Sequence, residues 1–344
     1  MRIMCSGTPV GMVTVLEGEN MAADSNATMK AVAIDAFGGR NQLKMMEVPV
    51  PEAQEGQVLV RIQAAGVNPV DWKIREGYLK DLFPHRFPLI PGWDMAGEVA
   101  GNGHAARRFQ PGEPVYGYCR RPVVQSGTYC EYIAISESYL TRRPLSLSDV
   151  QAAGLPLAGL TAYQAVYDAG GLKNHQSILI IGASGGVGSM AVQLARMVGA
   201  RIYAVAGKSN HDYLRELGAD VPIDYRSEEF VRRLRAEEPD GADVVFDLIG
   251  GESLEQARKC VKPGGRLISI VDDIGADLSP DTPYTFAFVF VEPNVRQLDR
   301  LGEMVRSGRL KLSVNRVYDL AEAAAAHEQM ESGHTRGKIV LQVT

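Results

Sequence analysis

The residues with the clearest chemical meaning form a glycine-rich turn between a buried strand and a helix. The β-branched and leucine run at 178–181 is typical of a strand that is buried on both faces. Four glycines follow it within residues 182–188, and apolar residues then recur at helical spacing up to Val198, before Gly199 as a C-terminal stop. Such a turn lets the backbone approach a ligand closely, and the free N–H groups at the helix start can hold a pyrophosphate.

The fit to the dinucleotide-binding fingerprint is incomplete at its first glycine. When the fingerprint is aligned on Gly185 and Gly188, Ala183 stands in the first place. A glycine turn that only packs a helix on a strand is therefore an alternative. Because the strand and helix patterns are right on both sides, we expect the turn to bind a dinucleotide. The residues involved are Ala183, Ser184, Gly185, Gly186, Val187 and Gly188.

A second alternative is a hydrolase. Residues 182–186 also spell G-x-S-x-G, the nucleophile turn that likewise joins a strand to a helix. A catalytic triad would need a later acid and a histidine, for which His327 or His334 could be nominated. The further glycine at 188 and the series of strands that follows favour the nucleotide site over this alternative.

The end of the next strand indicates which dinucleotide is bound. An NAD-binding site places an acidic residue there, about 20 residues past the glycine turn, to bind the ribose 2′-hydroxyl. Here the chain reads Ala-Val-Ala-Gly-Lys-Ser over 204–209, and the first acid is Asp212. Gly207 and Lys208 could instead receive a 2′-phosphate, which the lysine would meet as a point charge. The pattern favours NADPH over NADH, with a solvated loop lysine as the alternative for Lys208.

The elements that must position this turn fall into two patterns. From Lys30 to about Ser146, short apolar runs separated by Gly and Pro predict a compact, irregular β domain. Ser148 and Gln151 have capping-box spacing and predict the start of a helical region. Strands and helices then alternate. We expect strands at 178–181, 201–206, 221–224, 243–248, 266–271 and 286–291, and helices at 189–198, 210–217, 228–236 and 254–261.

This alternation predicts an α/β fold with a doubly wound, parallel, six-stranded sheet of the Rossmann type. Beyond it we expect a helix at 295–305, short strands around 310–317, an alanine-rich helix at 320–330 and a final strand at 338–343. The final strand should return to the first domain, since the nucleotide sheet already has its six strands. The predicted domains are residues 29–155 together with 293–344, and residues 156–292 for the nucleotide.

Composition argues against several classes of protein. The chain has 344 residues, enough for two domains, and its 45% hydrophobic and 22% charged residues are those of an ordinary globular protein. The formal net charge of −5 gives no hint of nucleic acid or an anionic membrane as partner. No apolar run approaches the length of a membrane span.

The N-terminal segment and the cysteines bear on localisation. Residues 1–28 look like a mostly disordered extension, with a natural start at Met21 or Met29, rather than a signal peptide. The cysteines are far apart and form no C-x-x-C pair, which fits unpaired thiols in a reducing cytoplasm. They are Cys5, Cys119, Cys130 and Cys260. We therefore expect a cytoplasmic protein.

Five stretches together resemble the medium-chain dehydrogenase/reductase superfamily, and within it the zinc-free quinone oxidoreductases, the zeta-crystallin-like branch. They are residues 65–71, 91–97, 157–162, 182–188 and 333–340, and the resemblance extends over about residues 29–344. It implies a GroES-like catalytic domain joined to a Rossmann domain, with the active site in the cleft between them. It also implies a homodimer through the strand at 286–291, whose three phenylalanines and two valines would otherwise form a sticky edge.

The resemblance also assigns roles to single residues. Asn68 and Tyr78 would face the substrate as the catalytic residues, and Trp72 stands where relatives often have a second tyrosine. The implied cofactor contacts beyond the glycine turn are Thr161 on the nicotinamide side, Tyr225 near the 2′-phosphate, and Leu248, Val271 and Lys338. The alternative for Tyr78 is a packed aromatic residue.

Three charged residues near these motifs have simpler interpretations. Asp71 and Arg75 could pair with each other on the surface. Asp94 follows Pro91 and Gly92 in a turn, where a carboxylate could cap backbone N–H groups. We therefore assign none of the three to catalysis.

The sequence lacks the ligands of a zinc alcohol dehydrogenase. Residues 69–71 take the place of the first ligand, and the G-H-E segment reads Gly92-Trp93-Asp94. His85, Asp94 and His104 could be proposed as ligands, but scattered histidines are usually surface or capping residues. Without a Lewis acid, a quinone or an activated C=C is easier to reduce than an alcohol is to oxidise, because the carbonyl of the substrate accepts the developing charge.

The predicted function is thus zinc-independent transfer of a hydride from NADPH to a small quinone or an α,β-unsaturated carbonyl. An enoyl-thioester reductase is an alternative, although it would need a basic patch for a phosphopantetheine or coenzyme A arm that the sequence does not locate. From a different class, the chain could be an NADPH-binding protein with little turnover, acting as a redox sensor or as a lens-crystallin-like structural protein.

Overall fold

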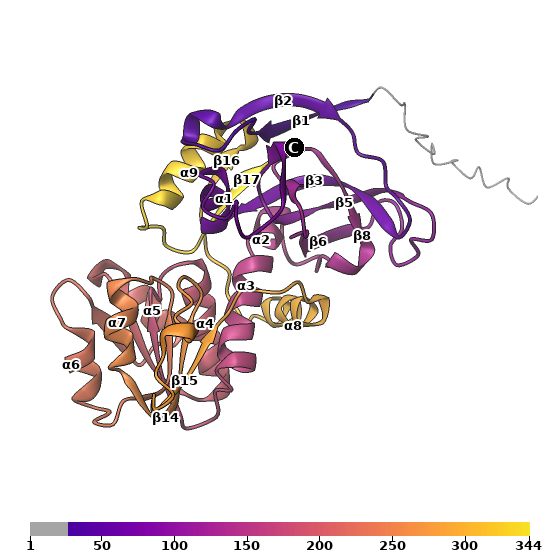
Figure 1. Cartoon of the computed structure of the whole chain (residues 1–344). Coiled ribbons are helices and arrows are strands. Elements are labelled where there is room, and N and C mark those ends of the chain that lie inside the picture. The colour runs from indigo at the N-terminus through magenta and orange to yellow at the C-terminus, as the bar shows by residue number, and fades with distance from the viewer. Residues whose placement is uncertain (1–26) are drawn as a thin grey trace, which may run out of the picture.

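The computed structural model describes residues 27–344, and these form two parts, each built on its own sheet (Figure 1). The predicted N-terminal extension lies outside the described residues, except for its last two positions. A β-rich first part and a parallel six-stranded sheet were both expected, and both are confirmed. No helix within residues 27–344 is long and apolar enough to cross a membrane.

The first part is built on a seven-stranded sheet in the order β16-β17-β3-β5-β6-β9, with β8 paired to β3. Its strands are β3 (Gln57–Val67), β5 (Asp94–Asn102), β6 (Pro114–Tyr118), β8 (Tyr132–Ser136), β9 (Leu140–Arg142), β16 (Val314–Asp319) and β17 (Lys338–Gln342). Two strand pairs accompany it: β1 (Thr28–Ala33) with β2 (Lys44–Pro49), and β4 (His85–Ile90) with β7 (Val124–Ser126). The pairing of β17 with β3 confirms that the last strand returns to the first domain.

The second part is a fully parallel sheet in the order β12-β11-β10-β13-β14-β15. Its strands are β10 (Ser177–Ile181), β11 (Arg201–Ala206), β12 (Val221–Asp224), β13 (Ala242–Asp247), β14 (Val261–Ser269) and β15 (Thr285–Phe288). The connecting helices are α4 (Gly186–Val198), α5 (His211–Leu217), α6 (Phe230–Arg235) and α7 (Glu252–Arg258). The strand order reverses between β10 and β13, and such a switch point is where ligands bind in open α/β sheets.

Two local predictions were wrong. The helix expected at 254–261 ends at Arg258, and Val261 is instead the first residue of β14, where it pairs with Ala242. The short helix α1 (Pro69–Arg75) was not expected in the β-rich part. Seven residues are too few to show a helical period, and tertiary contacts decide such a segment.

The helical region between the two parts begins as predicted. Ser148 Oγ accepts from Gln151 N at 3.2 Å, and Gln151 Oε1 accepts from Ser148 N at 3.1 Å, so the capping box of α2 (Asp149–Ala153) is confirmed. Helix α3 (Pro156–Tyr163) follows and continues as a π-helical segment over Gln164–Ala169. All eight residues of α3 are buried, because the helix is covered by both parts.

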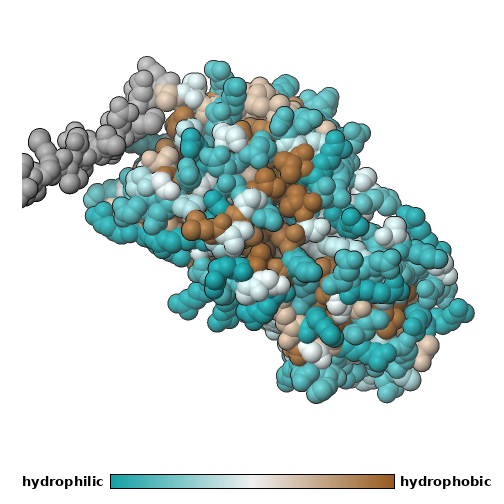
Figure 2. Space-filling model, turned by 180° about the vertical axis from the view of Figure 1, so that it is seen from behind, coloured by the Kyte–Doolittle hydropathy of each residue, from teal (hydrophilic) through white to brown (hydrophobic). Residues whose placement is uncertain are grey.

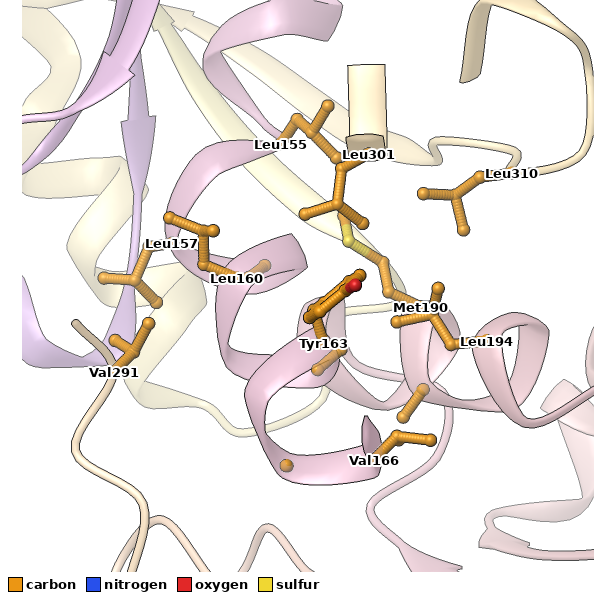
Figure 3. Packing of buried hydrophobic residues seen from close by; sticks show 14 of the residues in the cluster. Leu155, Leu157, Leu160, Tyr163, Val166, Met190, Leu194, Val291, Leu301 and Leu310 are labelled. Atoms are coloured by element: carbon orange, nitrogen blue, oxygen red, sulfur yellow. The ribbon is translucent and has the colours of Figure 1, made fainter. Parts of the chain in front are cut away.

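The core at this junction joins three helices. Figure 3 shows Leu155, Met190 and Leu301 close together, from the residue before α3, from α4 and from α8 (Val295–Arg306), while Leu160 of α3 lies beside Leu157. A Cβ added at Gly159 would lie 3.0 to 3.1 Å from the side chains of Leu155 and Leu301, so these leucines pack closely on the glycine. Helix α9 (Ala323–Glu331) packs on the first part, beside α1 and β17. On the face turned away from the viewer in Figure 1, hydrophobic side chains gather around the middle of the molecule, where the two parts meet (Figure 2).

Candidate active site

A cleft of about 1470 Å³ lies between the two parts and is lined by residues from both. Val67, Asn68 and Lys338 line it from the first part. The glycine turn and the carboxyl ends of β11, β12 and β13 line it from the second. Because two independent structural units meet here, a cofactor bound to one sheet would face side chains of the other.

The glycine turn is built by three glycines with different roles. Gly182 has a φ of +85°, which a residue with a Cβ rarely adopts, so the turn itself depends on this glycine. Gly185 is the N-cap of α4. A Cβ at Gly188 would collide with Gly182 O and lie 2.7 Å from Ala183 Cα, so only glycine lets α4 pack on the turn. The incomplete fingerprint is thus explained, since Gly182 supplies the tight turn and Ala183 is fully buried beside it.

The N-terminus of α4 can hold a pyrophosphate. The first N–H groups of a helix have no intrahelical partners, and they attract anions. The cleft-lining members of the turn are Ser184, Gly185, Gly186, Val187 and Gly188. The backbone present therefore fits the diphosphate of a dinucleotide.

The hydrolase alternative finds no support in this arrangement. Ser184 Oγ accepts from Asn210 Nδ2 at 3.3 Å, and no histidine within residues 27–344 is hydrogen-bonded to it. His327 is buried in the first part, where Nδ1 lies 3.2 Å from Arg75 Nη1. His334 lines the cleft, but its ring is hydrogen-bonded to the backbone of Ser332.

Sequence reasoning missed a cationic side chain that lines the cleft, that of Arg226. Arg226 lines the cleft with Tyr225, and its Nε donates to Tyr225 Oη at 3.3 Å. The guanidinium also stacks on that ring, with Cζ 5.5 Å from the centroid. Lys208 is exposed and is not among the lining residues, although Gly207 before it is. A basic residue directly after the tyrosine at the end of a strand was the signal that could have identified Arg226.

A buried polar cluster supports the cleft wall of the first part, and two of its members, Asn68 and Lys338, line the cleft. It comprises Asn68 at the N-terminus of α1, Asp71 in α1, Asp94 at the start of β5 and Lys338 at the start of β17, each at most 3% exposed. Lys338 Nζ donates to Val67 O at 2.9 Å and to Asn68 Oδ1, and it lies 3.8 Å from Asp94 Oδ2. Asn68 Nδ2 donates to Asp94 Oδ2 at 2.9 Å. The cluster therefore holds one ammonium group between amide and carboxylate oxygens.

The two carboxyl groups of the cluster have unusual protonation equilibria. Asp94 Oδ1 accepts from Leu157 N in α3 at 2.8 Å, so the residue does cap a backbone N–H, although it begins β5 and does not lie in the expected turn. Burial raises the pKa of Asp94 to about 6, although Lys338 and Asn68 oppose the rise. Burial also raises the pKa of Asp71 to about 7. Desolvation thus outweighs the ammonium group at both positions.

The expected surface pair of Asp71 and Arg75 was wrong, because both are fully buried and they bind different partners. Asp71 accepts from Asn68 N at 2.8 Å, so it points toward the start of α1. Arg75 ends the helix, and its Nη1 donates to Glu331 Oε1 on α9 at 2.8 Å. His327 connects Arg75 and Asp71. Its Nδ1 lies 3.2 Å from Arg75 Nη1, and its Nε2 lies 3.3 Å from Tyr129 Oη, which donates to Asp71.

The remaining predicted residues divide into two groups. Those that line the cleft are Asn68, Ser184, Gly185, Gly186, Val187, Gly188, Gly207, Tyr225, Leu248 and Lys338. Those that do not line it are Tyr78, Thr161, Ala183, Lys208 and Val271.

Two of the second group have local partners instead. Tyr78 is 66% exposed and packs edge-on against Trp72 at 5.7 Å. Thr161 is buried, and its Oγ1 donates to Leu157 O at 2.6 Å. The catalytic role of Tyr78 and the cofactor contact of Thr161 stay predictions.

Comparisons with known proteins agree with this architecture. Residues 54–145 match the family model for the alcohol dehydrogenase GroES-like domain, and residues 217–341 match one described as zinc-binding dehydrogenase. The chain is 33% identical to the chloroplastic quinone-oxidoreductase of Triphysaria versicolor, over 91% of this chain and 98% of that protein. It is 34% identical to the chloroplastic NADPH-dependent alkenal/one oxidoreductase of Arabidopsis thaliana, over 94% and 82%. The solved quinone oxidoreductase from Coxiella burnetii superposes with a TM-score of 0.86 at 33% identity, over 92% and 100%.

The description of the second family model implies zinc, and the residues of the cleft do not fit it. Zinc is bound by several thiolate, imidazole or carboxylate ligands around one point. Across the described range 27–344, no group of three or more such side chains could hold a metal ion. The buried carboxylates behind the cleft wall, Asp71 and Asp94, already accept from protein donors and lie near the Lys338 ammonium, which would repel a second cation.

Proposed function

Since this chain belongs to the quinone oxidoreductase branch of the medium-chain dehydrogenase/reductase superfamily, it is an oxidoreductase with a nicotinamide cofactor, and we propose that it reduces quinones or α,β-unsaturated carbonyls with NADPH. The observation that carries the proposal is the shared cleft. It brings a dinucleotide-binding turn on one sheet face to face with a buried polar cluster on the other. Relatives named for quinones and for alkenals or enones support these two substrate classes.

The residues of the second part would bind and orient the cofactor. The N-terminal N–H groups of α4 hold the pyrophosphate, and the carboxyl ends of β13 and β14 contribute Leu248 and Ile270 to the cleft. When bound, the nicotinamide supplies the hydride. The protein contributes position, exclusion of water, and hydrogen bonds from the wall formed by Asn68 and Lys338.

The choice of NADPH over NADH rests on the end of β11 and on Arg226. The chain has no acidic residue at 204–209 that would bind a ribose 2′-hydroxyl. Arg226 presents a guanidinium at the cleft. Lys208 directly follows Gly207, and Gly207 lines the cleft. Two cations would attract a 2′-phosphate, which only NADPH carries.

The test is NADPH oxidation by the purified protein with a panel of acceptors: ortho- and para-quinones, an alkyl enone and a crotonyl thioester, with NADH in parallel. We expect turnover with quinones or the enone, faster with NADPH than with NADH. Turnover with the thioester alone would favour the enoyl-thioester reductase. Tight binding of NADPH without turnover of any acceptor would contradict the proposal and favour a sensor or a structural protein.

We also propose a cytoplasmic location. Cys119, Cys130 and Cys260 are free thiols in the described part of the chain, which agrees with a reducing compartment. Cell fractionation with antibody detection tests this location, and recovery of the protein in an organelle fraction would contradict it.

A further inference from the structure

We propose that Lys338 is a catalytic residue: its ammonium group stabilises the negative charge that develops on the carbonyl oxygen of the acceptor and then donates a proton to it. The inference rests on the proposed function, because it concerns the acceptor in the same cleft. It differs from the role predicted for Lys338 as a cofactor contact, since it assigns the ammonium group to the substrate.

The ammonium group has one N–H free for a ligand at the cleft wall. Lys338 Nζ donates to Val67 O and to Asn68 Oδ1, and both of these residues line the cleft together with the lysine. Asp94 Oδ2 lies at 3.8 Å, which is beyond hydrogen-bond distance. A third acceptor for Nζ is lacking in the structure of residues 27–344, so the third N–H can bind an oxygen of the acceptor.

The backbone places this lysine next to the cofactor site. Gly337 N donates to Ser184 O in the glycine turn at 3.0 Å. A Cβ at Gly186 would lie 2.8 Å from Lys338 Cδ, so the lysine stem runs against the first residue of α4. The ammonium group thus stands between the turn that binds the cofactor and the polar cluster of the first part.

The charges around Lys338 suit a proton donor. The groups that face it are Asp94 on β5 and Asp71 on α1, with Tyr129 and His327 beyond Asp71. Burial lowers the pKa of Lys338 below its usual value, and Asp94 and Asp71 oppose this shift. The lysine therefore gives up its proton more easily than an exposed lysine, while the carboxylates favour its charged form.

The step balances without any further reactant except water. The hydride adds two electrons to the acceptor carbon, and an electron pair of the conjugated system comes to rest on the carbonyl oxygen. One N–H bond of Lys338 breaks as an O–H bond forms on that oxygen, and the amine regains its proton from water. A cation that protein oxygens already hold in place stabilises the oxyanion more than bulk water does, because little reorganisation is needed.

The first test compares Lys338→Met with Lys311→Met, which removes an exposed lysine outside the cleft lining. We expect Lys338→Met to lower kcat for quinones and enones about 100-fold, the usual effect of losing an oxyanion donor. NADPH affinity, measured by fluorescence titration, should change far less than kcat, and Lys311→Met should behave as wild type. Unchanged kcat in Lys338→Met would overturn the inference.

A second readout does not depend on turnover. Bound 4-nitrophenol, with its phenolate as a mimic of the oxyanion, should ionise at lower pH in the wild-type NADP⁺ complex than in water, as followed by absorbance. Lys338→Met should abolish this shift, and a shift that persists would contradict the role. If the wild type reduces no acceptor at all, the proposed function fails, while the nitrophenol titration still decides the role of Lys338.

Two further variants guard against misfolding and test the charge balance. Lys338→Met could destabilise the protein by leaving Asp94 without a cation, so Asp94→Asn combined with Lys338→Met removes both charges. We expect this double variant to fold, to bind NADPH and to remain as impaired in kcat as the single variant. Asp94→Asn alone should move the alkaline limb of kcat to lower pH, because a carboxylate that raises the pKa of Lys338 is lost. An unmoved limb would contradict the role of Lys338 as the acid.

Discussion

Recognition of the cofactor 2′-phosphate is decided by side chains at the ends of β11 and β12. Arg226 lines the cleft and is held in place by Tyr225, through both stacking and a hydrogen bond. Lys208 is exposed beside the cleft and makes a flexible point charge. A guanidinium that is already ordered loses less freedom on binding a phosphate, so Arg226 should contribute more than Lys208.

Removal of these cations should separate the two cofactors. We expect Arg226→Ala to raise KM for NADPH about 10-fold or more, because a hydrogen bond to a charged group contributes about 1.5–3 kcal/mol. Lys208→Ala should have a smaller effect, and neither variant should change KM for NADH. Steady-state kinetics with both cofactors measure this. An equal rise in KM for NADH would show that the arginine holds the site together rather than reading the phosphate.

The buried carboxyl group of Asp71 should make the stability of the protein depend on pH. Burial raises the pKa of Asp71 to about 7, above its value in the unfolded chain, so folding favours the protonated carboxyl. Its stabilising contribution is therefore complete below the unfolded pKa and is lost as the pH rises through about 7. In Asp71→Asn this dependence should disappear.

The measurement is urea unfolding of wild type and Asp71→Asn at pH 5 and pH 8. We expect the free energy of unfolding of wild type, relative to the variant, to fall by about 2–3 kcal/mol between these two pH values, because about two pH units of the gap between the folded and unfolded pKa lie in this range. A relative stability that rises with pH would mean that Asp71 is stabilised as the carboxylate, and the account of the polar cluster would have to change.

At the level of elements, the glycine turn has two positions with opposite tolerance. At Gly188 a Cβ meets the backbone of Gly182 and Ala183, which cannot move aside without displacing α4. At Gly185 the nearest atom to a Cβ is Gly182 O at 3.6 Å, and the position faces the cleft. Gly188 is thus needed for packing, and Gly185 leaves space for the ligand.

This contrast predicts two different phenotypes. Gly188→Ala should lower the free energy of unfolding by about 1–3 kcal/mol, as overpacking usually does, and should weaken NADPH binding as well. Gly185→Ala should unfold like wild type but bind NADPH more weakly, because the methyl group keeps the pyrophosphate from the backbone. Chemical denaturation and fluorescence titration separate the two effects. Equal loss of stability in both variants would contradict the assignment.

At the level of the whole molecule, β15 is the edge of the nucleotide sheet. Within the described residues it pairs with β14 alone, and residues 286–290 are half-buried. Val289 N donates to Ser269 O of β14 at 2.9 Å. Because successive N–H groups of a strand point to opposite sides, the N–H of Phe288 points away from β14, toward the open edge of the sheet. An apolar edge with free N–H groups invites pairing, and we propose that a second copy of the chain pairs with it to form a homodimer.

Proline at position 288 should break such a dimer. Phe288→Pro removes an outward N–H and leaves the inward ladder to β14 intact, whereas Phe288→Ala removes the same ring and keeps the N–H. Sedimentation velocity should show a dimer for wild type, a weakened dimer for Phe288→Ala and a monomer for Phe288→Pro. A wild type that sediments as a monomer would contradict the proposal.

Local sequence determined the nucleotide-binding half. The apolar run at 178–181, the glycines and the helix of α4 are contiguous, and the alternation of strands and helices predicted the six-stranded parallel sheet that the structure contains. Such patterns can be recognised because periodicity and turn chemistry depend on neighbours in the chain. The capping box of α2 and the return of β17 to the first sheet were also within reach of this reasoning.

Tertiary structure alone decided the polar wall of the cleft. Asn68 caps α1 and Asp71 lies within it, Asp94 belongs to β5 and Lys338 to β17, and Lys338 is 270 residues from the asparagine whose oxygen it binds. No local pattern shows that Asp71 is buried and turned away from Arg75. The physical reason is that strand pairing brings distant side chains together, and burial then sets which of them carry a charge.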